Sequence, residues 1–240
     1  MARILLTLLL AALPALAQLP AFEVASIKAN NTGDGRSTES TSPGRVTAVN
    51  TNISSLIQQA FGIKEFQISG APGWVVNDKY DFAATTGTTK DLSDVELEPY
   101  FQALLTERFH LQYHREAKEM QVYALGVAKT GAKVMAHAGA GDTSTSINNG
   151  PAKTSMKSTN VSMKGFAGTL GRRLDRLVID NTGLTGGYDL TLEWAPNPSP
   201  DSTEPSLFTA LQEQLGLKLE STEAPVEIIV IDNIERPSEN

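Results

Sequence analysis

The sequence has no cysteine in its 240 residues. Disulfide bonds are therefore excluded, and so are thiolate metal sites and a cysteine nucleophile. Aromatic residues are also few: they make up 6% of the chain and include only two tryptophans. A chain of this length nevertheless buries about 70% of its unfolded surface, so we expect the hydrophobic core alone to hold the fold together.

Long apolar runs are absent after the first 17 residues. Within that stretch, the run Ile4–Leu13, apolar except for Thr7, follows Arg3 and precedes Pro14 and the small residues Ala15 and Ala17. The run is shorter than the roughly 20 residues that span a bilayer. The order of positive charge, apolar run and small residues is instead typical of a cleavable signal peptide. We expect residues 1–17 to be removed and the mature chain, with no membrane span, to be exported into the periplasm or secreted.

Positive charge is in deficit, with 20 Lys and Arg against 27 Asp and Glu, for a net charge of −7. Loss of Arg3 with the signal peptide leaves 19 basic residues, and 19 − 27 gives −8 for the mature chain. Binding to nucleic acid needs a clustered basic face, and an anionic membrane surface also attracts basic residues. We therefore expect neither of them as a partner.

Three polar segments divide the chain. Residues 30–44, 136–158 and 196–205 are rich in Ser, Thr, Gly, Asn or Pro. Such segments bury too little apolar surface to offset the entropy of ordering, so we predict surface loops. On this basis a first α+β repeat with N-terminal strands occupies residues 18–135, the polar loop 136–158 follows, and a second α+β repeat occupies 159–240.

Hydrophobic periodicity predicts two helices in the first half of the chain. Ile53–Phe61 is amphipathic, with Ser54 as the expected N-cap and Gly62 as the helix stop. Val95–Phe109 carries apolar residues at helical spacing and follows Ser93 and Asp94, the two candidates for its N-cap. Alternating stretches around the helices predict strands at Phe22–Ile27, Arg45–Val49 and Lys79–Ala84.

A hairpin is predicted after the second helix. His110–His114 alternates polar and apolar residues, and Met120–Ala128 is a more apolar stretch. Residues 115–119 would form the turn between them.

The second half of the chain runs through the same order of features as the first. Two landmarks recur 108 residues later: Asn52-Ile-Ser54 corresponds to Asn160-Val-Ser162, and Tyr80-Asp81 corresponds to Tyr188-Asp189. A third, Glu98-Pro99, recurs 106 residues later as Glu204-Pro205. Each Asn-x-Ser and each Glu-Pro is expected to lead into a helix. The recurrence predicts an internal tandem repeat. With short joins between strands, it indicates an α+β fold in which helices cover one face of antiparallel sheets.

Five ordered motifs resemble a known protein family. They are Phe22–Lys28, Ile68–Trp74 with Tyr80-Asp81, Leu104–Phe109 with His114–Glu116, Asp180–Gly186 with Tyr188-Asp189, and Ala224–Asn240. Together they are similar to an uncharacterised exported family of soil bacteria, known only as a domain of unknown function. The resemblance implies no assigned activity and no catalytic residues to transfer. Related domains are attached to β-lactam-sensor-type membrane zinc peptidases, which implies extracytoplasmic sensing or binding. No such peptidase segment occurs in this sequence.

Two histidines form the most metal-like pair. On a strand, His110 and His114 would point to the same side, with Gln112 between them on one polar face. Two imidazoles with a third ligand from elsewhere would hold a divalent ion. The alternative is that both are ordinary exposed histidines, since no third clustered ligand is visible.

Four aromatic residues form the candidate ligand site. Trp74 and Trp194 are each predicted beside a turn or a long loop, where aromatic faces bind glycans or peptides. With Tyr80 and Tyr188 they would line one groove. The alternative is that each tryptophan covers an end of the core.

Catalytic motifs are weak. Ser155 and Ser162 each precede a lysine by two residues, and Ser162 is better explained as a helix cap. Asp81 and Asp189 recur at equivalent repeat positions, as a carboxylate pair would, but a Tyr-Asp at a strand start commonly fixes a turn. We identify no catalytic residue and no cofactor motif.

Three functions remain open. The first is an exported binding or sensory module for an unknown small molecule, a glycan or an envelope protein. The second is an extracytoplasmic hydrolase with an unassigned site. The third is a structural or interaction protein of the cell envelope.

Overall fold

The structure, a computed structural model, describes residues 20–33, 35–200 and 202–237. The predicted signal peptide, residues 1–17, lies outside this described part. The chain divides into two compact units. Unit 1 contains the chain up to Ala117 and from Glu227 onward, and unit 2 is Lys118–Val226. No helix among the described residues has both the length and the apolar character needed to cross a membrane.

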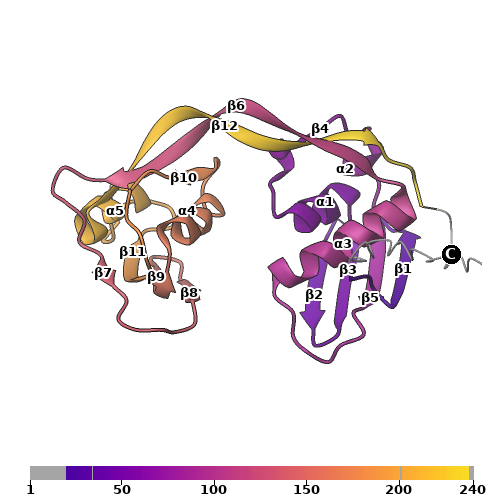
Figure 1. Cartoon of the computed structure of the whole chain (residues 1–240), viewed down its shortest axis with the longest axis horizontal. Helices are drawn as coiled ribbons and strands as arrows, with labels where there is room; N and C mark the ends of the chain where they lie inside the picture. Colours follow the sequence, from indigo (N-terminus) through magenta and orange to yellow (C-terminus); the bar gives the residue numbers. More distant parts are fainter. Residues whose placement is uncertain (1–19, 34, 201, 238–240) are drawn as a thin grey trace, which may run out of the picture. The chain divides into compact units, whose positions relative to one another are not determined.

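Unit 1 is built on a four-stranded antiparallel sheet of order β1-β5-β3-β2. Its elements are β1 (Val24–Ala29), β2 (Thr38–Ser42), β3 (Arg45–Thr51), α1 (Ile53–Phe61), the 3-10 turn η1 (Glu65–Gln67), β4 (Ile68–Ser69), α2 (Trp74–Asn77), β5 (Tyr80–Thr85) and α3 (Asp94–Phe109). Helices α1 and α3 pack on one face of this sheet (Figure 1). The core lies between these layers, where Ile53, Leu105 and Phe109 are fully buried.

Unit 2 has a second four-stranded antiparallel sheet, of order β7-β11-β9-β8. Its elements are β7 (Met135–Ala136), β8 (Ser144–Asn149), β9 (Thr154–Val161), α4 (Met163–Gly171), β10 (Val178–Asp180), β11 (Tyr188–Trp194) and α5 (Leu207–Leu215). Its core gathers around Phe166, Leu192 and Leu211, each fully buried. The predicted α+β class is therefore confirmed, and the two sheets list corresponding strands in the same order, as a tandem repeat would produce.

The third sheet, of order β10-β6-β12-β4, corrects the predicted hairpin. β6 (Gln112–Val127) and β12 (Leu217–Asn233) are single long strands, and residues 115–119 continue β6 without a turn. These five residues contain no glycine, proline or asparagine to reverse the chain. Two of their charged side chains have partners within the sheet: Arg115 pairs with Glu227 of β12, and Glu116 with His114.

Two of the three polar segments are also corrected. Segment 30–44 contains β2, and segment 136–158 contains β8 and the start of β9. Both β2 and β8 lie at the edge of a sheet, and every residue of β2 is exposed. A strand at an edge forms ladder hydrogen bonds without burying side chains, so its composition resembles that of a loop.

The turn that leads into the first helix of each unit is the same. Asn50 and Asn160 adopt left-handed φ values of 57° and 51°. Two residues later Asn52 caps α1 and Ser162 caps α4. Ser54, the predicted N-cap of α1, lies inside that helix. The equivalent of Asn160 is thus Asn50 rather than the Asn52 that matched it in sequence.

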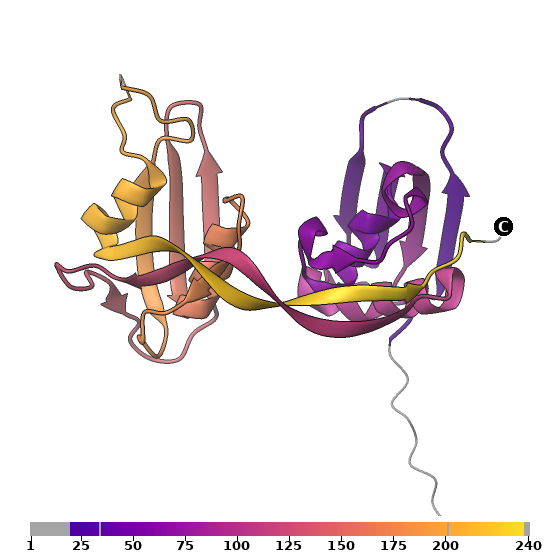
Figure 2. The same cartoon turned by 90° about the horizontal axis from the view of Figure 1, so that it is seen from above.

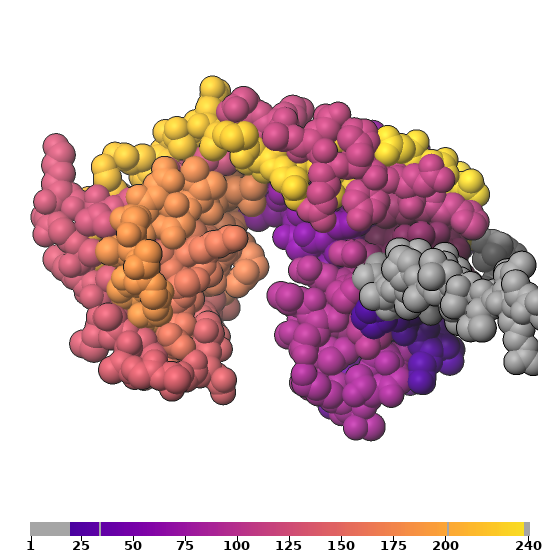
Figure 3. All heavy atoms as spheres, in the orientation of Figure 1, coloured from indigo at the N-terminus to yellow at the C-terminus, as the bar shows by residue number. Residues whose placement is uncertain are grey.

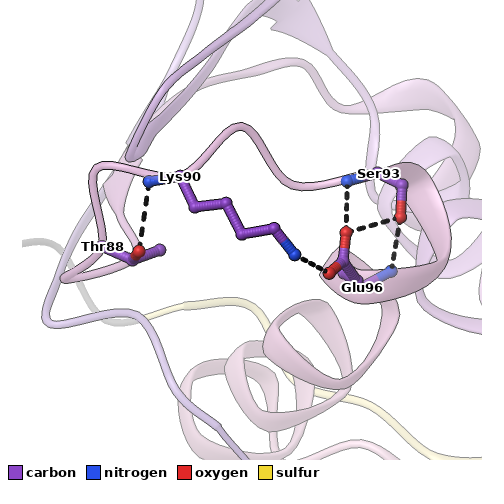
Figure 4. Close-up of polar contacts among 4 residues, drawn as sticks. All are labelled: Thr88, Lys90, Ser93 and Glu96. Atoms are coloured by element: carbon purple, nitrogen blue, oxygen red, sulfur yellow. Dashed lines mark hydrogen bonds and ion pairs between the residues drawn. The ribbon is translucent and has the colours of Figure 1, made fainter.

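Helix α3 begins with a capping box. Ser93 Oγ accepts from the backbone N–H of Glu96, and a Glu96 oxygen accepts from the backbone N–H of Ser93 at 2.9 Å (Figure 4). Lys90 Nζ donates to the other Glu96 oxygen at 2.6 Å. The Lys90 hydrogen bond and those from Ser93 lower the pKa of Glu96 to about 2. The landmark Glu98-Pro99 lies inside this helix, whereas Glu204-Pro205 precedes α5.

Candidate functional site

A pocket in unit 2 is the best candidate for a ligand site. Its volume is about 340 Å³, within the range of about 300–1,000 Å³ that is usual for small-molecule sites. We call it the Trp194 pocket. It is lined by Asn149, Gly150, Thr154, Arg173, Leu174, Trp194, Ala195, Pro196, Pro198, Ser206, Leu207 and Phe208. The predicted site residue Trp194 is among them, and the other lining residues were not identified from the sequence.

The segment between β11 and α5 forms one wall of the pocket. It leaves the end of the sheet beside the turn that joins β8 to β9 (Figure 2), and its atoms lie at the surface of unit 2 (Figure 3). The Ala195 N–H donates to Pro205 O at 2.8 Å, which closes the segment at its base. Ser206 then caps α5 by accepting from the Thr209 N–H at 3.2 Å. Pro196 and Pro198, which line the pocket, follow this closed base.

The turn between β8 and β9 forms the opposite wall. Gly150 donates its N–H to Lys153 O at 2.9 Å, and a Cβ at Gly150 would lie only 2.8 Å from that oxygen. Asn149 Oδ1 accepts from an Arg173 guanidinium N–H at 2.8 Å. This contact holds the side chain of Arg173, which follows α4, against the turn.

Two of the lining side chains, those of Thr154 and Trp194, each carry a polar group. Thr154 and Trp194 are only 2% and 6% exposed, yet both line the cavity. Within the described part of the chain, neither the Thr154 hydroxyl nor the Trp194 indole N–H makes a hydrogen bond. Neither polar atom is among the buried side-chain atoms that lack a partner in the described structure, so both are open to solvent and available to a ligand or to water.

An aromatic stack supports the outer wall. Phe208, in the first turn of α5, contacts Tyr123 of β6 edge to face, with ring centroids 5.5 Å apart. The Arg176 guanidinium lies 5.2 Å from the centre of the Tyr123 ring. Phe208 is 37% exposed, so part of its ring is left for contact with a ligand.

The other predicted aromatic residues have different surroundings. Tyr80 and Tyr188 are core residues, 4% and 8% exposed, and the Tyr188 hydroxyl donates to Thr185 O at 2.9 Å. Trp74 begins α2 in unit 1, where the Arg236 guanidinium lies 5.1 Å from its ring centre. Burial of the two tyrosines favours a packing role for them. A ligand role for Trp74 stays a prediction.

The predicted metal pair, His110 and His114, does not lie on one strand. His110 is the C-cap of α3 in a left-handed conformation, and only His114 lies in β6. His114 Nδ1 contacts Asp232 at 2.9 Å and its Nε2 contacts Glu116 at 3.0 Å. Hydrogen bonds to these two carboxylates, Asp232 first, raise the pKa of His114. No group of three or more His, Asp or Glu side chains among the described residues is arranged to hold a metal.

The two recurring aspartates stabilise turns. Asp81 accepts from the Asn50 N–H and Asp189 from the Asn160 N–H, each at 3.0 Å. The Asn160 N–H is the main reason for the lowered pKa of Asp189. Asp189 also contacts His137 at 2.9 Å. Each carboxylate therefore fixes the left-handed asparagine before a helix, which agrees with the turn alternative.

A comparison with family models gives one match, to the family described as protein of unknown function (DUF3738), over residues 54–234. The chain belongs to this family. The DUF3738 match covers most of both units, including the whole Trp194 pocket. Neither the curated proteins nor the solved structures contain a match to the chain.

Proposed function

We propose that this DUF3738 protein is an exported binding module that holds a small molecule in the Trp194 pocket. The observation that carries the proposal is a cavity of about 340 Å³ in which apolar side chains are combined with the hydrogen-bond donors of Thr154, Arg173 and Trp194. An apolar cavity with a few converging polar groups is the usual form of a small-molecule site.

Hydrogen bonds within the walls support the same function. The proline segment is closed by the bond from Ala195 to Pro205, and Arg173 is held by Asn149. A pocket that is already formed loses less conformational entropy when it binds a ligand.

A second cavity, in unit 1 near Phe22 and Arg108, is smaller, about 220 Å³.

Export is supported by the order of charge, apolar run and small residues in the first 17 residues. The test is mass spectrometry of the protein recovered from outside the cytoplasm. Export predicts an N-terminus at Gln18. A full-length chain retained in the cytoplasm would contradict it.

A thermal-shift screen of the purified protein tests the binding function. The compounds are small acids, amines, sugars and peptides. A ligand at 100 times its dissociation constant adds about 2.7 kcal/mol of stability, which raises Tm by several degrees. Phe208→Ala should reduce the shift, because Phe208 lines the pocket. Phe66→Ala, which removes an exposed aromatic residue of unit 1, should leave it unchanged.

The same screen separates the alternatives. A shift that survives Phe208→Ala but disappears with Phe66→Ala would place the site elsewhere and contradict the proposal. Turnover of a compound, detected by mass spectrometry, would indicate the hydrolase. If no compound shifts Tm and the protein assembles with itself or with envelope proteins, the interaction function would replace the binding function.

A further inference from the structure

We propose that the Trp194 pocket binds an aromatic carboxylate, a small anion that joins a carboxylate group to a single flat ring. This inference rests on the proposed function, because it names the class of ligand for the same pocket. It follows from the charge and the donors of the lining residues and from the shape of the apolar walls.

The charge that lines the pocket is positive. Arg173 carries the single charge among the described lining residues, and none of them is acidic. Its contact with Asn149 uses one N–H of the guanidinium, which has five donors in a planar fork. In the described part of the chain Arg173 forms no ion pair. A guanidinium held in this way matches a carboxylate, which accepts two parallel hydrogen bonds.

The other polar groups at the pocket also favour an anion. The indole N–H of Trp194 is a donor with no acceptor function, and the Thr154 hydroxyl can donate as well. The nine-residue helix α5 begins at the cavity with Ser206 and Leu207, and the N-terminus of a helix attracts negative charge. A cationic ligand would meet no carboxylate among the described lining residues.

The apolar part of the pocket favours a flat ring. Trp194 and Phe208 contribute aromatic rings, and Pro196 and Pro198 contribute rigid ones, so the walls have little freedom to adapt. Aromatic rings gain from offset or edge-to-face contact in addition to burial. The volume of about 340 Å³ lies at the small end of the usual range, which suits a single ring.

A series of compounds with the same ring tests the charge. Benzoate, benzamide and benzylamine are titrated into the Trp74→Phe protein, in which Trp194 is the remaining tryptophan and its fluorescence reports on the pocket. Acetate serves as the carboxylate without a ring. We expect benzoate to bind at least about tenfold more tightly than benzamide, which corresponds to about 1.4 kcal/mol. Benzylamine and acetate should bind more weakly than benzoate.

Two arginine variants locate the carboxylate. Arg173→Gln should weaken benzoate binding by at least about tenfold and leave benzamide binding nearly unchanged. Arg172→Gln removes the same charge from the neighbouring residue, which bonds to Thr169 instead of lining the pocket. It should leave benzoate binding unchanged, and circular dichroism confirms that both variants are folded.

The outcomes separate this inference from the proposed function. Benzamide or benzylamine binding as tightly as benzoate would overturn the inference, while the pocket would still be a ligand site. Equal loss in Arg172→Gln and Arg173→Gln would show a nonspecific charge effect and would also overturn it. If none of the four compounds changes the fluorescence, the assignment of aromatic carboxylates as the ligand class is wrong. The broader thermal-shift screen then tests the proposed function separately.

Discussion

Units 1 and 2 share a strand order but differ where the last helix begins. Helix α3 of unit 1 has 16 residues, whereas α5 of unit 2 has nine, and both end at a left-handed residue. The additional turns of α3 take the place in sequence of the irregular segment that forms a wall of the Trp194 pocket. The position 108 residues before Trp194 is Thr86, a buried residue whose hydroxyl has no partner in the described structure.

The difference separates features that the two units share from features that only the Trp194 pocket has. In both units an aspartate fixes the left-handed asparagine before the first helix, so this turn belongs to the scaffold. The pocket depends instead on the shortened helix, on the proline segment and on a tryptophan at the end of β11. Substitutions in the shared scaffold should therefore change stability similarly in both units. Substitutions of pocket residues should affect ligand binding in unit 2 alone.

The largest expected effect comes from the two cores. Phe109→Ala in unit 1 and Phe166→Ala in unit 2 each remove a fully buried ring, at a cost of about 3–5 kcal/mol of unfolding free energy. Hydrogen exchange followed by mass spectrometry should show faster exchange mainly in the unit that carries the substitution. Equal acceleration in both units by either variant would show that they unfold together and would break the comparison.

Loss of the helix caps should have a smaller effect, with a difference between the units. Ser93→Ala and Ser206→Ala each remove an N-cap, worth about 1 kcal/mol. Ser93 should cost more, because it forms a full capping box with Glu96 and Ser206 does not. Urea unfolding of both variants measures the difference. A larger loss for Ser206→Ala would contradict the account of these caps.

A pH dependence is expected from unit 1. The pKa of His114 is raised above its ordinary value of 6.5 by Asp232 and Glu116. The folded state thus holds the proton more tightly than the unfolded state, so this stabilisation is present below pH 6.5 and is lost as pH rises through the folded pKa. His114→Gln should flatten the stability profile between about pH 6 and 8. An unchanged profile would assign the dependence to another group.

The smallest effect should be a slight gain at Thr86. Replacing its unpartnered buried hydroxyl with the methyl group of valine should leave stability unchanged or raise it, by no more than about 1 kcal/mol. In unit 2, Thr154→Val should leave stability nearly unchanged but weaken ligand binding, because Thr154 lines the Trp194 pocket. Chemical unfolding and a ligand titration of the two variants provide the comparison.

Local patterns in the sequence predicted much of the scaffold. The periodicity of Ile53–Phe61 gave that helix its observed bounds, and Gly62 ends it as expected. The N-cap of α1 was predicted two residues too late. Ser54 matches Ser162 in sequence, but in the fold the residue equivalent to Ser162, the N-cap of α4, is Asn52. The long strands were missed because the charged residues 115–119 interrupt the apolar alternation. The contact that places Arg115 comes from Glu227 of β12, far along the chain.

The pocket was predictable only at Trp194, which is a rare residue beside a proline-rich stretch. Its other polar residues, Asn149, Thr154 and Arg173, come from β8, β9 and the segment after α4. No spacing in the sequence connects them. They come together because β9 lies between β8 and β11 in the sheet, a pairing that periodicity does not specify.

The most direct test of the central claim uses the two tryptophans, one in each unit. Protein labelled with 5-fluorotryptophan should give two fluorine NMR signals, assigned through Trp74→Phe. Titration with a compound that raises Tm should move the Trp194 signal and leave the Trp74 signal in place. Movement of the Trp74 signal alone, or of neither signal while Tm still rises, would contradict a ligand site in the Trp194 pocket.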